Sequence, residues 1–354
     1  MVFRRLRPFA LPLLALMLLG VVVLICLVIL PQAADKEFVA LLEANGLKVS
    51  DVRKYEFAGE RLGLRSPWPY YSIKASGEAN LTPDVLESLR RHRNSIARVE
   101  LVELAATDEM LSVVSRMTHL KDLTMIGFKR EWPEGVTLDG LRKLTYLTIR
   151  GVGFTDVQGR RLNRLPNLSI VDLRQTRIGD ETFTALSELR SLYFLKIEGT
   201  RVTDEGCLRL ASRTSGEAFP SLKTLFADMT AIGDASVPFL ASLPNLRNLR
   251  LESPDITDAG VRELLERSTS LASLDVAGGQ ISGVGWALVP WNAPIESLGV
   301  DGTQFTGSDI LTMFRLHPQL MSVMPPTGAY TPEEIKDLHS LLEERGAWPY
   351  PAKK

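Results

Sequence analysis

Residues that commonly hold transition metals are scarce in this sequence, which has 2 cysteines and 4 histidines among 354 residues. Cys26 lies in a long apolar run and Cys207 in a mixed segment, so neither a disulfide framework nor a multi-cysteine metal site can be built from the pair. The histidines, His92, His119, His317 and His339, share no common spacing. We therefore expect no metal site and predict that the histidines lie on the surface.

A concentrated basic region is also lacking. The 41 lysines and arginines nearly balance the 42 acidic residues, and three of the arginines fall within the first thirty residues. The remainder of the chain is slightly acidic, which argues against a nucleic-acid partner. The motifs Gly-Lys-Ser/Thr, His-Glu-x-x-His, Gly-x-Ser-x-Gly and Cys-x-x-Cys do not occur. The sequence thus offers no catalytic constellation, and we expect a non-enzymatic protein without a cofactor or a small-molecule substrate.

One long apolar run lies near the N-terminus, from Phe9 to Leu30, with no charged residue among its 22 residues. At about 1.5 Å per residue, a helix of this length crosses a hydrocarbon layer of roughly 30 Å. Three arginines precede the run and no basic excess follows it, so the positive-inside rule places the N-terminus in the cytoplasm and the rest outside it. The alternative is a cleaved signal peptide and a secreted protein, although the run is long and its end lacks a good cleavage site.

The rest of the sequence carries an internal repeat. The pattern L-x-x-L-x-L, with leucine-like residues at its fixed positions, recurs at steps of 24, 24, 24, 24, 30, 24, 25, 24 and 25 residues. Its first residues are Ile96, Leu120, Leu144, Leu168, Leu192, Leu222, Leu246, Leu271, Ile295 and Leu320. Near-equal steps of this length are typical of solenoid proteins, in which each unit packs only against its neighbours.

Each unit predicts a short strand, a turn and a short helix. In the unit that begins at Leu192, apolar and polar residues alternate, so its strand should bury Leu192, Leu195 and Ile197. Later in each unit the apolar spacing becomes helical, as at Phe183 and Leu186. The helix should therefore return the chain to the start of the next strand.

The turn between strand and helix has a signature of its own, a Thr-Asp pair such as Thr203-Asp204 or Thr257-Asp258. Scattered aspartates could indicate calcium binding or acid catalysis, but these recur at one position of the repeat. We expect the Thr or Asp side chain to accept hydrogen bonds from N–H groups that open the helix.

These units resemble the leucine-rich-repeat family, whose pattern is L-x-x-L-x-L-x-x-N/C-x-L. The resemblance implies an α/β fold, a right-handed solenoid with a curved parallel sheet on its concave face and short helices on its convex face. It also implies recognition of a protein partner through the concave face. The sequence departs from the family at the Asn/Cys position, where Thr176, Thr200, Thr230 and Thr303 stand. A threonine hydroxyl can still bond to the backbone of the turn.

Taken together, these segments predict five regions. The last repeat should end in a helix that carries Ile335, Leu338 and Leu341 and opens with a capping box formed by Thr331 and Glu334. The predicted regions are a cytoplasmic N-terminus (1–8), a transmembrane helix (9–30), an N-terminal cap with a degenerate repeat (31–95), the solenoid (96–342) and a C-terminal tail (343–354).

Apolar residues and cations gather at outward positions of successive strands, where rows of side chains lie about 4.8 Å apart. The apolar members are Tyr146, Ile170, Phe194 and Phe226, and the basic residues beside them are Arg150, Arg174, Lys196 and Arg250. This is the composition of an interface centre, so we predict that these residues bind the partner. The alternative is that the aromatic residues only stabilise the sheet, and that the chain is a structural spacer or envelope scaffold.

Overall fold

The computed structural model describes residues 30–51, 71–77, 79–103, 107–127, 130–133, 135–212, 217–276, 281–282, 291–301, 303–324, 328 and 331–345. The chain forms two compact units, Met1–Leu120 and Lys121–Lys354. Among the described residues no helix is both long and apolar enough to cross a bilayer. Of the predicted span 9–30, all but Leu30 lies outside the described residues, as do the tail residues 346–354.

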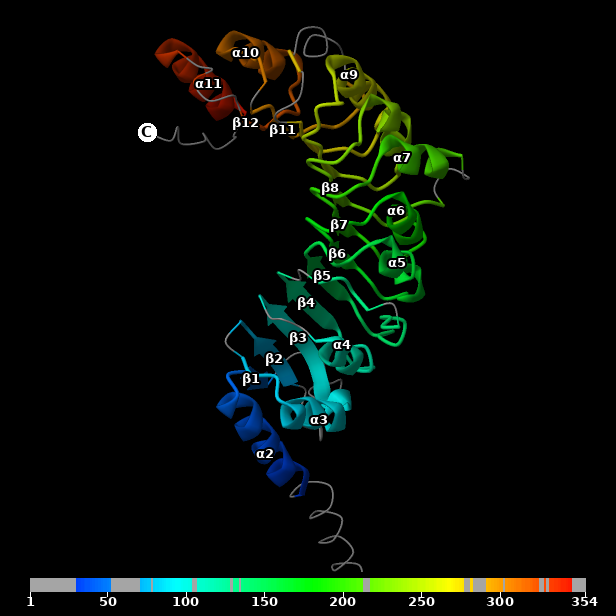
Figure 1. Ribbon diagram of the computed structural model, residues 1–354. Coiled ribbons are helices and arrows are strands. Elements are labelled where there is room, and N and C mark those ends of the chain that lie inside the picture. Colours follow the sequence, from blue (N-terminus) through cyan, green and yellow to red (C-terminus); the bar gives the residue numbers. More distant parts are fainter. Residues whose placement is uncertain are drawn as a thin grey trace, which may run out of the picture. The chain divides into compact units, whose positions relative to one another are not determined.

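The first unit combines three strands with helices (Figure 1). Strand β1 pairs antiparallel with β2, and β2 pairs parallel with β3. The Phe38 ring of the first helix stacks on His92 at a centroid distance of 4.0 Å. The elements are α2 (Leu30–Ala44), β1 (Lys48–Asp51), β2 (Tyr71–Ala75), α3 (Pro83–Arg91), η3 (Arg93–Ser95), β3 (Ile96–Val102) and α4 (Asp108–Val114).

The second unit repeats strand, turn and helix along one parallel sheet. Within the described residues, its strands follow in the order of the sequence from β4 to β12, each parallel to the next. They are β4 (Asp122–Ile126), β5 (Tyr146–Arg150), β6 (Ile170–Asp172), β7 (Phe194–Lys196), β8 (Thr224–Phe226), β9 (Asn248–Arg250), β10 (Ser273–Asp275), β11 (Ser297–Gly299) and β12 (Ser322–Met324).

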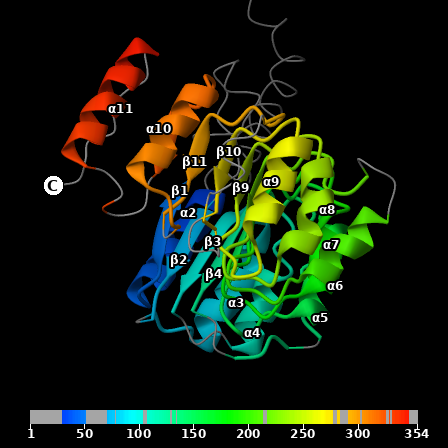
Figure 2. The same ribbon diagram turned by 90° about the horizontal axis from the view of Figure 1, so that it is seen from above.

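Short helices lie between the strands along the chain. Helices α5 to α9 all lie on one side of the sheet, and within the described residues of this unit no helix covers the other side of β5 to β9 (Figures 1 and 2). The described helices of this unit are α5 (Asp156–Gly159), η4 (Leu162–Arg164), α6 (Asp180–Leu186), α7 (Asp204–Ala211), η5 (Asp234–Ser236), α8 (Val237–Ser242), α9 (Asp258–Arg267), α10 (Gly307–Leu316) and α11 (Pro332–Glu344). The expected long parallel sheet with short helices is therefore confirmed.

The core lies between the sheet and these helices. Leu192, Leu195 and Ile197 are each 0% exposed, as the alternation predicts. Phe183 and Leu186 of α6 are also fully buried. The apolar side chains of the strand and those of the helix face the same space between the sheet and the helices. Each unit therefore buries one apolar row from its strand and another from its helix.

The eighth residue of several units has a left-handed backbone, which turns the chain as the strand ends. Glycine, which pays no steric cost for positive φ, stands there at Gly127, Gly151 and Gly199. In other units the residue is not glycine, and Gln175 and Met229 adopt φ values of 58° and 53°. For such residues this conformation costs about 1–2 kcal/mol.

Threonine replaces the family's Asn or Cys in the turn without loss of the backbone contact. The hydroxyl groups of Thr176 and Thr200 each donate to the carbonyl oxygen three residues earlier, at 2.7 Å in both units. Thr230 and Thr303 make the same bond at 2.6 Å. The expectation that a hydroxyl can bond to the turn backbone is confirmed.

The Thr-Asp pair does cap helices, but its two members serve different units. The hydroxyl of Thr203 accepts the N–H of Glu205 within its own helix α7. Asp204 instead accepts the N–H of Gly233, which lies in the following unit, at 2.8 Å. The same contact to the next unit is made by Asp156, Asp180, Asp234 and Asp258. The aspartates therefore connect neighbouring units, which goes beyond the expected local cap.

The last described helix closes the second unit. Thr331 and Glu334 form the predicted capping box of α11. Among its apolar residues Leu342 is buried, whereas Ile335, Leu338 and Leu341 are only half-buried. Arg345 follows the helix and donates to the carbonyl oxygens of Phe314, His317 and Leu320.

The prediction that the histidines lie on the surface is wrong for His317, which is 4% exposed and stacks on Trp291 at a centroid distance of 3.5 Å. His92 is also partly covered, by Phe38. Stacking removes the apolar faces of two flat rings from contact with water. This favours the burial of a histidine even where it has no metal or catalytic role.

Candidate functional site

The predicted site residues all belong to neighbouring strands, β5 to β9, or to the turns that follow them. Tyr146 pairs with Ile170 across β5 and β6, and Ile170 pairs with Phe194 across β6 and β7. Lys196 pairs with Phe226, and Phe226 pairs with Arg250 on β9. Their side chains project from the side opposite the buried leucines because strand residues alternate between the two faces.

Two aromatic rings form the apolar centre of this face. Phe194 and Phe226 meet edge to face, with centroids 5.6 Å apart. The ammonium of Lys196 lies 5.1 Å from the first ring and 5.2 Å from the second, and the guanidinium of Arg250 lies 5.8 Å from Phe226. Both rings are half-buried, whereas Tyr146 is 44% exposed. The cluster thus combines cross-strand stacking with cation–π contacts.

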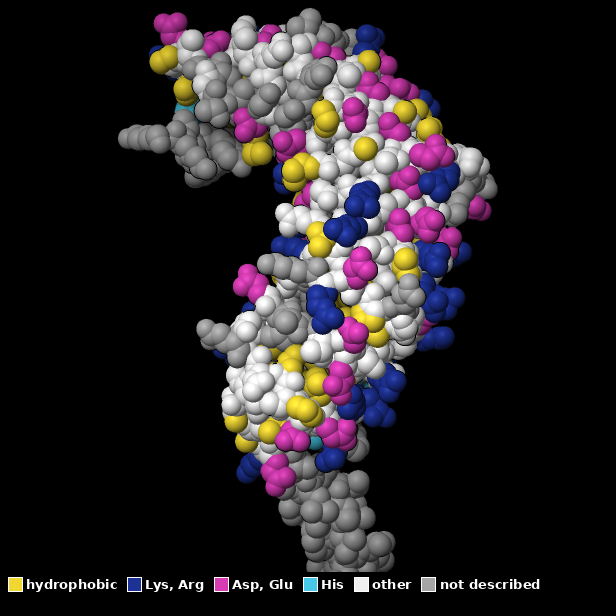
Figure 3. Space-filling view, viewed as in Figure 1, with side chains coloured by type: hydrophobic (Ala, Val, Ile, Leu, Met, Phe, Trp, Pro, Cys, Tyr) yellow, Lys and Arg dark blue, Asp and Glu magenta, His cyan; other side chains and the backbone are white. Residues whose placement is uncertain are grey.

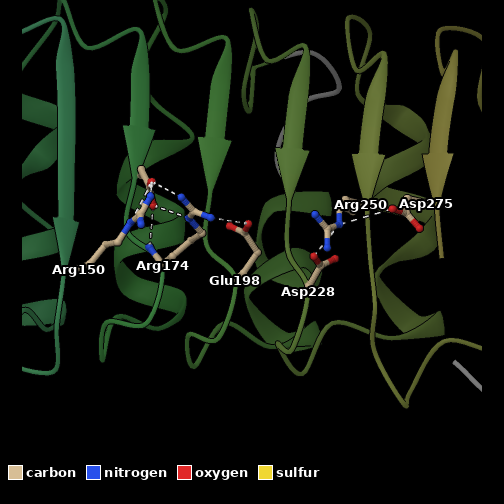
Figure 4. Close-up of polar contacts among 7 residues, drawn as sticks. Arg150, Arg174, Glu198, Asp228, Arg250 and Asp275 are labelled. Atoms are coloured by element: carbon tan, nitrogen blue, oxygen red, sulfur yellow. Dashed lines mark hydrogen bonds and ion pairs between the residues drawn. The ribbon is translucent and has the colours of Figure 1, made fainter. Parts of the chain in front are cut away.

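Carboxylates that the sequence analysis did not single out alternate with the predicted arginines. Arg150 and Arg174 both contact Asp172, at 2.7 and 2.8 Å. Arg174 also lies 3.7 Å from Glu198. Farther along, Arg250 contacts Asp228 at 2.8 Å and Asp275 at 3.5 Å. Figure 4 shows this ion-pair row, made of Arg150, Asp172, Arg174, Glu198, Asp228, Arg250 and Asp275, along the ends of adjacent strands.

The sequence contained a signal for these carboxylates. Asp172 and Asp275 stand at the fifth position of their units, and Glu198 and Asp228 at the seventh, which are the same outward positions used to select the arginines. The acidic residues at the fifth and seventh positions of the units are visible in the sequence, and including them with the aromatic and basic residues would have predicted the four carboxylates. In the space-filling view, basic and acidic side chains lie close to one another over β6 to β8 (Figure 3).

Burial affects the acidic members of the ion-pair row differently. Burial raises the pKa of Asp172, but hydrogen bonds from Arg174 and Arg150 outweigh it, and the pKa lies below its ordinary value. Burial also raises the pKa of Asp228, and there it prevails over the backbone N–H of Glu252 and over Arg250. For Glu198 burial is again the largest cause, and its pKa is raised. Two guanidinium groups therefore outweigh burial at Asp172, whereas weaker pairing does not at Glu198 or Asp228.

A cavity of about 220 Å³ opens within this face. Its lining combines five members of the ion-pair row with two turn residues and consists of Arg150, Arg174, Gln175, Glu198, Asp228, Met229 and Arg250. Met229 is 64% exposed although it is apolar. The predicted arginines therefore line a polar depression beside the aromatic pair.

Other groups that could carry chemistry do not converge in the part of the chain that the structure describes. It contains no group of three or more His, Cys, Asp or Glu residues placed to hold a metal ion. Cys207 lies in the core, and burial raises the pKa of its thiol to about 12. A thiol in that state is protonated near neutral pH and is a poor nucleophile.

No family model and no curated protein sequence matches this chain. Among solved structures, it is similar to an internalin (inlF) from Listeria monocytogenes, with 17% sequence identity and a TM-score of 0.47, over 81% of this chain and 86% of the internalin. It is also similar to the leucine-rich-repeat ectodomain of the Arabidopsis thaliana membrane receptor kinase GASSHO1/SCHENGEN3, solved in complex with CASPARIAN STRIP INTEGRITY FACTOR 2. That match has 16% identity and a TM-score of 0.46, over 71% of this chain and 28% of the receptor.

Proposed function

We propose that this chain is a membrane-anchored leucine-rich-repeat protein that binds a protein partner through the open, concave face of its parallel sheet and has no catalytic role. Residues 9–30 would anchor it in the bilayer, with the repeats outside the cytoplasm. The observation that carries the proposal is the aromatic pair of Phe194 and Phe226 beside the ion-pair row, on a face that none of the described helices of this unit covers.

The composition of this face supports binding. Aromatic residues and arginines supply most of the energy at the centre of protein interfaces. Here their side chains are held in place before a partner arrives, because Arg174 is bonded to Asp172 and Lys196 lies over two rings. Side chains that are already ordered in the free protein lose less conformational entropy when the partner binds, so binding is more favourable.

The test compares partner affinity and stability in the same variants. A partner is first identified by cross-linking to the full chain in detergent, and its dissociation constant is then measured for Phe194→Ala, Arg174→Ala and a control, Tyr193→Ala. Tyr193 is exposed next to Phe194 but is not one of the predicted site residues. We expect a loss of affinity of about tenfold or more for the first two variants, because each removes a central contact.

The melting temperature separates binding from scaffolding. Unchanged melting temperatures with lost affinity support the proposed face. Unchanged affinity with lowered melting temperatures assigns the aromatic residues to the sheet and favours the spacer or envelope-scaffold role.

A further inference from the structure

The cavity on the open face is shaped by the side chains of three successive turns. Gln175 and Met229 occupy the eighth positions of their units and line the cavity, while the unit between them has Gly199 at that position. Glycine leaves no side chain above the neighbouring Glu198. The depression therefore gives access to Glu198 between a polar wall and an apolar wall.

The ion-pair row is interrupted at this point. Contacts run from Arg150 through Asp172 and Arg174 to Glu198, and from Asp228 through Arg250 to Asp275. Among the contacts of the described residues, no ion pair or hydrogen bond joins Glu198 to Asp228 (Figure 4). Two carboxylates on adjacent units thus stand next to each other in the lining of one cavity. The row has three guanidinium groups and four carboxyl groups, so one carboxyl group has no guanidinium of its own.

Glu198 is the incompletely paired member of the row. Its side chain is 9% exposed and its Oε1 lies 3.7 Å from Arg174, whose guanidinium already donates two hydrogen bonds to Asp172. Its Oε2 is buried and accepts no hydrogen bond from the residues that the structure describes. A buried polar atom without a partner destabilises the fold, and a charged one does so more strongly.

Asp228 differs because both of its oxygens have partners. Oδ1 accepts the N–H of Glu252 at 3.0 Å, and Oδ2 accepts Nε of Arg250 at 2.8 Å. Carboxylate oxygens have more than one lone pair, so Asp228 can still accept a further donor. Lys196 lies on β7, the strand that precedes Glu198. Its ammonium lies over the aromatic rings and forms no ion pair with Glu198 or Asp228 among the described contacts.

The chemistry of the lining selects the occupant. An anion would have to displace carboxylates from guanidinium groups that are already bonded to them. A divalent metal is a poor fit, because no group of three ligand residues converges in the described part of the chain. A cation with several N–H donors and an aliphatic stem fits, since its head would reach Glu198 and its stem would lie against the exposed side chain of Met229.

We propose that this cavity takes one cationic side chain, the ammonium of a lysine or the guanidinium of an arginine, from a polypeptide partner that binds between Glu198 and Asp228. This inference rests on the proposed function and assigns a chemistry to the partner. The bound cation donates to the Glu198 carboxylate, which lines the cavity, and restores the alternation of charge along the row.

The test uses the full chain in detergent and small probes that carry the proposed group. Saturation-transfer NMR titrations measure the affinity of N-acetyl-lysine methylamide and N-acetyl-arginine methylamide, with the uncharged N-acetyl-norleucine methylamide as a probe control. Glu198→Gln removes the charge with little change of shape. Glu252→Gln removes a charge at the same repeat position two units farther along, outside the cavity lining, and is the control variant.

We expect at least one cationic probe to bind, with an affinity lower by about tenfold or more in Glu198→Gln and unchanged in Glu252→Gln. Equal affinity of wild type and Glu198→Gln, or equal binding of the norleucine probe, overturns the inference. The comparison of probes on the wild type needs no variant, so it decides the question even if Glu198→Gln does not fold. Partner affinity that depends on Phe194 but not on Glu198 would overturn the cation site and leave the proposed function standing.

Discussion

Asp180 accepts two hydrogen bonds from Thr203 in the following unit, from the backbone N–H at 2.8 Å and from the hydroxyl at 2.9 Å. This contact fixes the residue that opens α7 to the first turn of α6. Gly206 stands where an added Cβ would approach the Asp180 carboxylate to 2.7 Å. The glycine that follows the Thr-Asp pair therefore leaves room for the aspartate of the preceding unit.

Replacing Asp180 with alanine should destabilise the second unit by about 1–3 kcal/mol, because the N–H of Thr203 loses its acceptor in a partly buried position. Glu181→Ala is the matched control, since its side chain is 59% exposed one residue along the same helix turn. Urea unfolding followed by circular dichroism measures both variants. Equal midpoints for the two would contradict a role for the contact between units.

Leu195→Asp should be severely destabilising, by more than about 3 kcal/mol, because it places a carboxylate without a partner in a position that is 0% exposed. Tyr193→Asp, two residues earlier, should be mild because Tyr193 is exposed. Thermal unfolding of both variants measures the difference. A large destabilisation by Tyr193→Asp alone would contradict the assignment of Leu195 as buried and Tyr193 as exposed.

Stability should depend on pH through Glu198. Burial raises its pKa in the folded chain, and the charged groups that also act on it are Arg174, Asp172 and Asp228. The folded chain therefore holds a proton that the unfolded chain has released above its ordinary pKa of about 4.3. The contribution of Glu198 to stability is complete below that pH and is lost as the pH rises through the raised value.

Glu198→Gln cannot ionise and should escape this loss. Its free energy of unfolding, relative to wild type, should rise between about pH 4 and pH 7. Urea titrations across this range measure the trend, and Glu252→Gln, whose carboxylate lies outside the cavity lining, is the control. A difference that stays flat with pH would contradict the raised pKa.

Membrane anchoring remains a prediction from the sequence. The full chain should pellet with membranes and require detergent for release. The reason is that the transfer of 22 uncharged residues from the bilayer into water is strongly unfavourable. A chain that lacks residues 9–30 should be soluble. A shortened product in the soluble fraction that begins near residue 35 would show cleavage instead, and protection of the repeats from external protease would contradict the orientation.

The repeated strand and helix could be predicted from the sequence because two periodicities recur at a fixed step. The same step places Tyr146, Ile170 and Phe194 on one face, as the strand register confirms. The contacts of the arginines could not be predicted in the same way. Whether Arg174 binds Asp172 or Glu198 depends on rotamers and on the distance between adjacent turns, and neither follows from spacing.

Two other features could not be predicted from the periodicity of the sequence. A recurring aspartate shows that a turn needs an acceptor, but it does not show that Asp204 serves Gly233 of the next unit rather than its own helix. The burial of His317 depends on Trp291, which lies in an earlier segment and stacks on it only in the folded chain. Both features arise from packing between units, which a pattern within one unit does not contain.

The contacts of the aspartates all run the same way along the chain, from Asp156 to Asp258, each toward the unit that follows. The array therefore has a direction. Removal of a unit from its C-terminal end leaves an aspartate in water, where a carboxylate is readily hydrated. Removal from its N-terminal end leaves N–H groups at a helix start without their acceptor. Truncation by one unit should thus be tolerated better from the C-terminal side.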